Sequence, residues 1–201
     1  MRFTTCLAVL AVAAGAAAST GCSSPCHIPS DVIAVARQTK PGGQFFIEFD
    51  EGGSVVGADA DIDVGAVPAN IREIADREFP GGEQVAAERE YGDGEVMWEV
   101  VKKIDGRLFE ILITDDGKVV GGEEALAEKD WPAAVADGAR AAVPGANIEA
   151  LEKVWGPEAH FGEAYHVKFM KDGDSLRVGV DEGGKVVRVV RRIPGQVRIP
   201  R

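Results

Sequence analysis

One short phrase occurs three times in this 201-residue chain, and it constrains the fold more than any other feature. The phrase is an apolar residue, a proline, two variable residues and a second apolar residue, followed nine residues later by Pro-Gly. The three copies begin at Ile28, Val67 and Trp131. Because a fixed order of residues recurs, we interpret the chain as a duplication of one supersecondary unit.

Each copy of the phrase predicts one amphipathic helix between its two prolines. In the second copy, Ile71, Ile74 and Ala75 recur at helical spacing, and charged residues occupy the opposite face. A proline suits the first helical turn, where its missing N–H costs nothing, and the later proline forces the residue before it out of helical geometry. Trp131, like the apolar residue that opens each copy, is expected to pack over the first turn.

Strand-like segments follow the helix in the second and third copies. Residues 83–91, 96–104 and 107–114 alternate in polarity and are separated by turn signals such as Asp-Gly, which is typical of antiparallel hairpins. The third copy repeats this order. In the strand 107–114, the face that is expected to pack on the helix consists of Phe109, Ile111 and Ile113. The opposite face, which is expected to lie free of the helix, consists of Leu108, Glu110, Leu112 and Thr114.

The first copy has a helix but only two short strand-like segments, so we expect it to dock onto the second copy. The predicted fold class is α+β: tandem repeats, each with one helix packed on an antiparallel three- to four-stranded sheet. The expected divisions are a signal peptide (1–21), a tether (22–27), a truncated first repeat (28–63), two full repeats (64–122 and 129–191) and a basic tail (192–201).

This order of elements resembles the PepSY-like family of exported bacterial proteins, which is similar in fold to the beta-lactamase inhibitory protein. The residues that carry the resemblance are the apolar-Pro entry to the helix, the exit through Phe79-Pro80-Gly81, and the Gly-Lys-Val-Val endings at Gly117 and Gly184. The resemblance implies modules that bind or inhibit other envelope proteins. It implies no catalytic residues, and no inhibitory loop can be matched to this sequence.

The amino terminus predicts export. Arg2 is followed by an apolar and small-residue stretch, and no acidic residue occurs before Asp31. Residues 19–22, Ser-Thr-Gly-Cys, resemble a lipobox, which predicts lipidation of Cys22 and anchoring in the bacterial cell envelope on the periplasmic side. Alternatively, ordinary cleavage after Ala18 would give a secreted soluble protein in which Cys22 and Cys26 can form a disulfide.

Several classes of function are disfavoured. The formal net charge of −11 opposes nucleic-acid binding, although the last stretch of the chain is basic and leaves a contact with anionic lipid or an acidic partner open. Common catalytic and zinc motifs are absent from the sequence, so we predict no enzyme and no cofactor. Asp59-x-Asp61-x-Asp63 opens like a calcium loop but continues with Val64 and Asn70 where glycine and glutamate are needed, so no metal site is assigned.

The sequence therefore favours a non-catalytic envelope lipoprotein that binds or inhibits a protein partner. Large side chains on an open sheet face supply rigid contact area, so the candidate partner-binding face consists of Tyr91, Leu108, Leu112 and Trp155. The alternative hypothesis is a small-ligand or calcium-responsive binding protein that uses the acidic surface.

Overall fold

The first proline in each copy of the repeated phrase precedes a helix, as predicted. The computed structural model describes residues 28–50, 52–92, 94–156 and 162–196, and its α-helices are α1 (Ser30–Ala36), α2 (Ala69–Glu78) and α3 (Ala133–Ala142). The residues that follow α2 and α3, Phe79 and Val143, have φ of −121° and −124°. These φ values lie outside the helical range, because a following proline disfavours helical backbone geometry.

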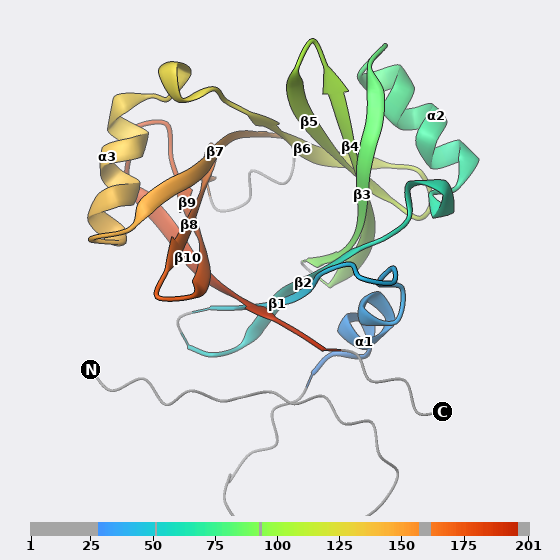
Figure 1. The fold of residues 1–201 in the computed structure, drawn as a ribbon, viewed down its shortest axis with the longest axis horizontal. Coiled ribbons are helices and arrows are strands. Elements are labelled where there is room, and N and C mark those ends of the chain that lie inside the picture. Colours follow the sequence, from blue (N-terminus) through green and yellow to red (C-terminus); the bar gives the residue numbers. More distant parts are fainter. Residues whose placement is uncertain (1–27, 51, 93, 157–161, 197–201) are drawn as a thin grey trace, which may run out of the picture.

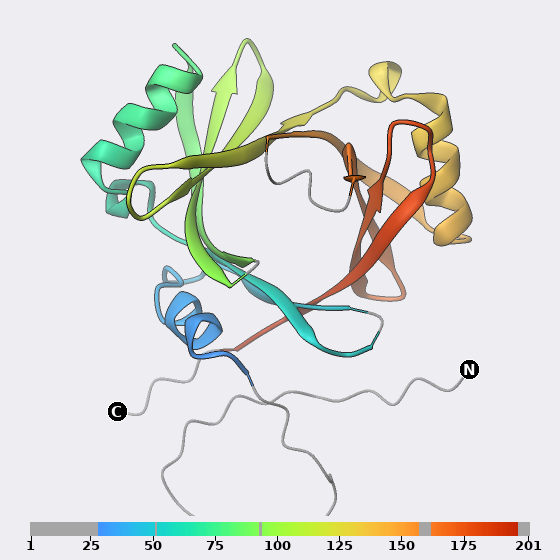
Figure 2. The same cartoon turned by 180° about the vertical axis from the view of Figure 1, so that it is seen from behind.

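All the strands form one closed antiparallel barrel (Figure 1). Each strand pairs with its neighbours in the sequence, and β1 also pairs with β10, which closes the ring. Seen from behind, the same ring carries the helices on its outside (Figure 2). The strands are β1 (Phe45–Phe49), β2 (Val55–Asp61), β3 (Glu83–Gly92), β4 (Glu95–Ile104), β5 (Arg107–Thr114), β6 (Val119–Ala125), β7 (Asn147–Trp155), β8 (Tyr165–Lys171), β9 (Asp174–Val180) and β10 (Val186–Pro194).

The predicted fold class of tandem helix-on-sheet repeats is therefore wrong. Strands make up 49% of the structure, and no repeat keeps a sheet of its own, because β2 pairs with β3, β6 with β7 and β10 with β1. The first repeat does dock onto the second, as predicted, but it also pairs with the third. The strands β6 and β10 end at Ala125 and Pro194, beyond the predicted repeat ends at 122 and 191.

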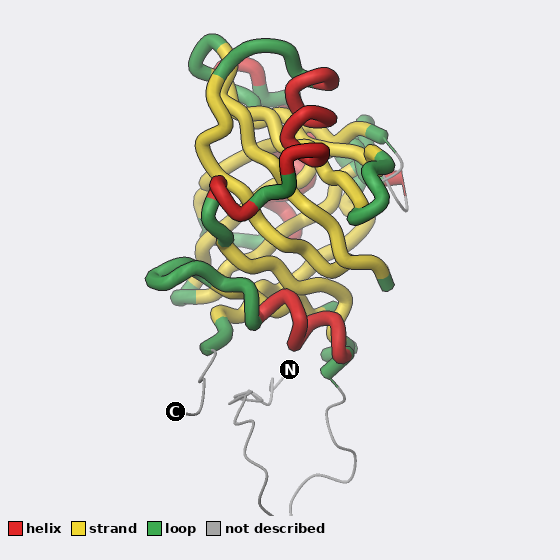
Figure 3. The backbone as a smooth tube through the Cα atoms, turned by 90° about the vertical axis from the view of Figure 1, so that its right-hand side faces the viewer, coloured by secondary structure: helices red, strands yellow, loops and turns green. Residues whose placement is uncertain are grey.

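The helices lie against the outside of the barrel wall (Figure 3), and a hydrophobic core lies beneath each of them. The core under α2 contains Ile111 and Ile113 of β5, and the Phe109 ring lies 5.0 Å from Phe79, so the predicted helix-facing side of this strand is confirmed. Val178 and Val180 of β9 occupy the same place under α3. Each core is enclosed between a helix and the outer face of the barrel wall, so it needs no side chains from the barrel interior.

Glycines allow close packing where the second and third repeats join. A Cβ atom at Gly122 of β6 would lie 2.1 Å from the carbonyl oxygen of Glu110 and 2.8 Å from the Trp155 ring. A Cβ atom at Gly156 would lie 2.7 Å from the Cα of Gly121. Side chains at these positions would force β6 and β7 apart, so the glycines help to continue the sheet from one repeat into the next.

Candidate functional site

The barrel interior is lined mainly by ionisable side chains. Successive residues of a strand point to opposite faces, so the residues that alternate with the three cores point inward and form what we call the inner face. Carboxylates outnumber basic groups among the described residues of this face. The carboxylates are Glu48, Asp59, Glu88, Glu90, Glu99, Glu110, Glu123, Glu152 and Glu163, and the basic groups are His166, Lys168, Arg177, Arg188 and Arg192.

The two signs of charge come from different parts of the barrel. Strands β1 to β7 supply most of the carboxylates, and strands β8 to β10 supply the basic groups. Arg177 Nη2 donates to Glu48 Oε2 at 2.6 Å, and Arg192 Nη2 donates to Asp59 Oδ1 at 2.5 Å. These pairs join the third repeat to the first across the seam that closes the barrel.

His166 of β8 lies between two carboxylates. Its Nδ1 is 2.6 Å from Glu123 Oε1 and its Nε2 is 2.8 Å from Glu163 Oε2. Since both ring nitrogens face acceptors, the imidazolium form satisfies both contacts. Burial opposes that charge, but the charge and hydrogen bond of Glu123, with the hydrogen bond of Glu163, raise the pKa of His166.

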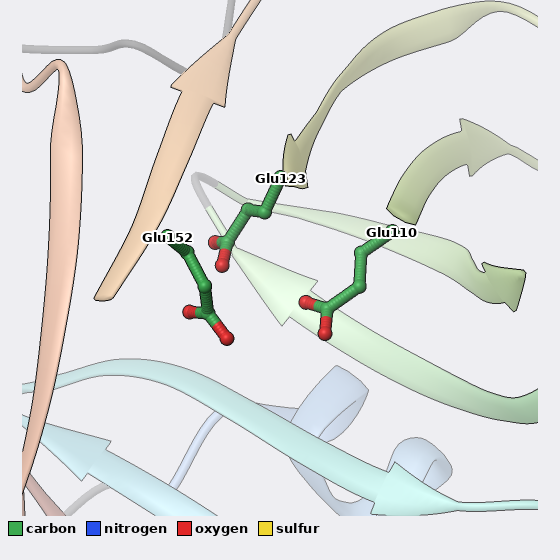
Figure 4. A group of neighbouring side chains, drawn as sticks. All are labelled: Glu110, Glu123 and Glu152. Carbon is green, nitrogen blue, oxygen red and sulfur yellow. The ribbon is translucent and has the colours of Figure 1, made fainter. Parts of the chain in front are cut away.

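Glu110, Glu123 and Glu152 bring their carboxylates together from β5, β6 and β7 (Figure 4). One oxygen from each lies within 4.8 Å of the others. Lys168 Nζ donates to Glu152 Oε1 at 2.8 Å, whereas the buried Glu123 Oε2 and Glu152 Oε2 have no donor among the described residues except a proton that the two carboxyl groups share. We call these residues the three-glutamate cluster.

The members of this cluster differ in protonation. Burial, with the negative charge of Glu123, raises the pKa of Glu152 well above its usual range, and burial also raises that of Glu110. Burial opposes ionisation of Glu123 too, but the charge and hydrogen bond of His166 and the charge of Lys168 hold its pKa well below the usual range. The cluster therefore has one firmly ionised carboxylate beside two that hold protons readily.

Other carboxylates of the inner face are also poorly compensated. Glu88 lies opposite Glu99 in the β3–β4 register. Burial and the charge of Asp59 raise the pKa of Glu88 to about 7, and burial and the charge of Glu110 raise that of Glu99 well above its usual range. An interior of this kind can take up protons or small cations.

The candidate partner-binding residues do not form one face. Leu112 is 1% exposed and lies in the barrel wall, and Tyr91 and Trp155 pack against the cores under α1 and α2. Leu108, at 37% exposed, is the one member of the four that counts as exposed. The sequence assigned these residues to a shared open surface because it predicted an open sheet, and closure of the barrel removes that surface.

The predicted basic tail begins inside a strand. Arg192 belongs to β10 and pairs with Asp59, and Arg191 Nη2 donates to Asp174 Oδ1 at 2.8 Å. Part of the basic stretch therefore neutralises the protein's own carboxylates. The predicted signal peptide, tether, Cys22 and Cys26 lie outside the described residues.

Two hollows accompany these groups. A cavity of about 50 Å³ opens among inner-face residues that include Glu123, His166, Arg177 and Arg188. A larger hollow of about 590 Å³ lies outside the barrel, between Trp131, Arg140 of α3 and the first half of β7. The inner cavity has the size of one or two water molecules, so a ligand there must be small.

Sequence reasoning missed the three-glutamate cluster because its members come from three strands in two repeats. The available signal was the period of two: Glu110, Glu123 and Glu152 each occupy a position that alternates with helix-facing residues. Without the pairing of β6 with β7, nothing indicated that these positions share a space.

No family model matches this chain, and no curated protein is similar to it. The PepSY-like resemblance therefore stays a prediction. None of the described helices is long and apolar enough to cross a membrane.

Proposed function

We propose that the protein is a non-catalytic binding protein of the cell envelope that takes up small cations on the inner face of its barrel. The observation that carries this proposal is the unmatched negative charge of that face, where two buried carboxylate oxygens, on Glu123 and Glu152, have no donor among the described residues. Two such oxygens in one cluster need a proton or a cation between them.

The energetics of the fold support a ligand role for this charge. Burying a carboxylate costs free energy unless it is paired, and a hydrophobic interior of similar volume is often at least as stable. The three outer cores already hold the helices on the sheet. An ionisable interior with excess carboxylates is thus better explained by binding than by stability.

The proposed location in the cell envelope rests on the amino-terminal sequence. A lipobox at Cys22 would anchor the protein in the envelope, and secretion after cleavage at Ala18 is the alternative. Fatty-acid labelling in intact cells distinguishes the lipoprotein from the secreted protein. If Cys22 is lipidated, the parent chain is labelled and a Cys22→Ser variant loses all label. If the protein is secreted after cleavage at Ala18, the parent chain carries no label.

A small ligand is favoured over a protein partner, because Tyr91, Leu108, Leu112 and Trp155 offer no shared surface. The protein-partner hypothesis and the PepSY-like assignment remain predictions. Crosslinking in intact cells would test the former.

The experiment for the proposed function is thermal unfolding after chelation, at pH 7.5, with Ca²⁺, Mg²⁺ or NaCl at matched ionic strength. A ligand at about 100 times its Kd stabilises the folded state by about 2.7 kcal/mol, which raises Tm by roughly 5 to 10 °C in a chain of this size. A rise with a divalent cation beyond that with NaCl is expected. Equal curves in all three solutions at millimolar cation would refute the proposal.

A further inference from the structure

We infer that Glu110, Glu123 and Glu152 bind a single hard divalent cation of the size of Ca²⁺, and that Lys168 competes with it. The inference rests on the proposed function and specifies where the cation lies and which groups hold it. The three glutamates extend from β5, β6 and β7 toward one another (Figure 4).

The distances suit such an ion. One oxygen from each glutamate lies within 4.8 Å of the other two. Metal–oxygen distances of about 2.3 to 2.6 Å are usual for Ca²⁺, so one ion can bridge oxygens that lie up to roughly 5 Å apart. Mg²⁺ demands shorter distances and a stricter octahedron, which this spacing favours less.

The donor set selects the class of ion. The cluster offers carboxylate oxygens, and the nearby His166 ring has both nitrogens engaged by Glu123 and Glu163. Hard cations such as Ca²⁺, Mg²⁺ and Mn²⁺ prefer oxygen ligands, whereas zinc sites use histidine and cysteine. The cluster therefore suits a hard ion better than zinc.

An independent feature points to a ligand at this position. Glu123 and Glu152 are 6% and 4% exposed, and each has one oxygen for which the only donor among the described residues is a proton shared with the other carboxyl group, a place that a cation can take. Carboxylates that served only as ion-pair partners would have both oxygens satisfied, as charged groups in a protein interior usually do.

Lys168 is the ammonium group that balances the cluster in the structure. Its Nζ donates to Glu152 Oε1 at 2.8 Å, and its side chain is 29% exposed. Because the chain reaches solvent, the ammonium can withdraw when a divalent cation enters. Removing the ammonium should strengthen cation binding, an effect that loss of a merely structural ion pair would not produce.

Calorimetric titration of Ca²⁺ into the chelator-treated full chain tests this inference. Glu152→Gln should weaken binding by on the order of tenfold or more, because a charged ligand is lost. Lys168→Met should strengthen it by about tenfold, because a positive charge is removed from within hydrogen-bond distance. Glu73→Gln, which removes an exposed carboxylate of α2 outside the barrel, is the matched control and should change the Kd by less than about twofold.

The outcomes separate the two proposals. If Ca²⁺ binds the parent chain and all three variants with the same Kd, the cation lies elsewhere and this inference is overturned while the proposed function stands. If neither the parent chain nor Lys168→Met binds Ca²⁺ at millimolar concentration, this inference is overturned, and the proposed function is overturned with it only if Mg²⁺ also fails to raise Tm beyond NaCl. Circular dichroism of each variant confirms that it is folded before titration, and Lys168→Met keeps the inference testable if Glu152→Gln does not fold.

Discussion

The second and third repeats place opposite charges at two equivalent positions of the inner face, and a charged side chain opposite an apolar one at two more. Ile62 N donates to Ala87 O in one repeat, and Leu126 N donates to Leu151 O at the same point of the next, which aligns the two strand by strand. The strand registers then match the inner-face positions in pairs: Glu99 with His166, Val101 with Lys168, Glu110 with Arg177, and Glu123 with Val190.

The outer face has changed far less. Val100 and Ile111 under α2 correspond to Val167 and Val178 under α3, and all four are buried. Outer positions must pack against a helix, which favours apolar side chains, whereas inner positions must only be compatible with the opposite wall. Lys102 is an exception, because it is buried on the outer face and pairs with Asp76 of α2, where the third repeat has Phe169. The duplication therefore kept the core of each repeat and diverged in the charge that it contributes to the shared interior.

The largest expected effect comes from removing a basic group of the third repeat. Arg177→Met leaves the buried Glu48 with only the longer 3.5 Å contact to Arg192, which should cost about 3 to 5 kcal/mol of unfolding free energy. Arg191→Met is the matched control on the solvent side, because its pair with Asp174 is partly exposed, and should cost less than about 1 kcal/mol. Urea denaturation measures both, and equal losses would show that the inner face is not a distinct environment.

The acidic wall of the second repeat predicts a pH dependence. The pKa of Glu88 is about 7 in the folded protein against 4.5 for the free side chain, so between these values the folded state binds more protons than the unfolded state. Stability should therefore fall as pH rises from about 4.5 to 7, by up to roughly 3 kcal/mol from this group.

Glu88→Gln removes that contribution and should flatten the fall. Unfolding free energies at pH 5, 6, 7 and 8 for the parent and variant give the comparison. Parallel curves would mean that Glu88 titrates normally and that the wall is solvated.

A smaller effect distinguishes α3 from α2. Gly138 of α3 stands where α2 has Ile74, and a Cβ atom there would lie 1.9 Å from the carbonyl oxygen of Gly184. Glycine in a helix usually costs about 1 kcal/mol relative to alanine. Here Gly138→Ala should instead destabilise the protein, by about 1 to 3 kcal/mol, because α3 is forced away from the β9–β10 turn.

Thermal or urea unfolding of Gly138→Ala is sufficient as a test. A gain in stability would show that α3 lies farther from the turn than the structure has it.

The sequence predicted individual elements well and their assembly poorly. The prolines located all three helices, and the alternation at Phe109, Ile111 and Ile113 identified the helix-facing side of β5. Those signals are local, because they depend on backbone geometry and on a side-chain period within one segment. Pairing between repeats depends on which edge strands meet, as β6 and β7 do where Gly122 lies opposite Trp155. The sequence of either strand carries no local signal for this choice of partner.

The candidate site escaped prediction for the same reason. In the sequence, Glu110, Glu123 and Glu152 each occupy an ordinary polar position of a half-buried strand. In an open sheet, these side chains would be exposed to solvent. Closure turns the same pattern into a buried interior and moves Leu112 from a supposed binding face to a buried position.

The central claim is that the first and third repeats close the barrel around a charged interior, and a double-mutant cycle of Glu48→Gln and Arg177→Met tests it most directly. These residues are 129 positions apart in the chain and meet only if β1 pairs with β10. The account predicts a coupling energy of about 2 kcal/mol in urea unfolding. Additive losses, with coupling below about 0.5 kcal/mol, would contradict the closed barrel and its inner face.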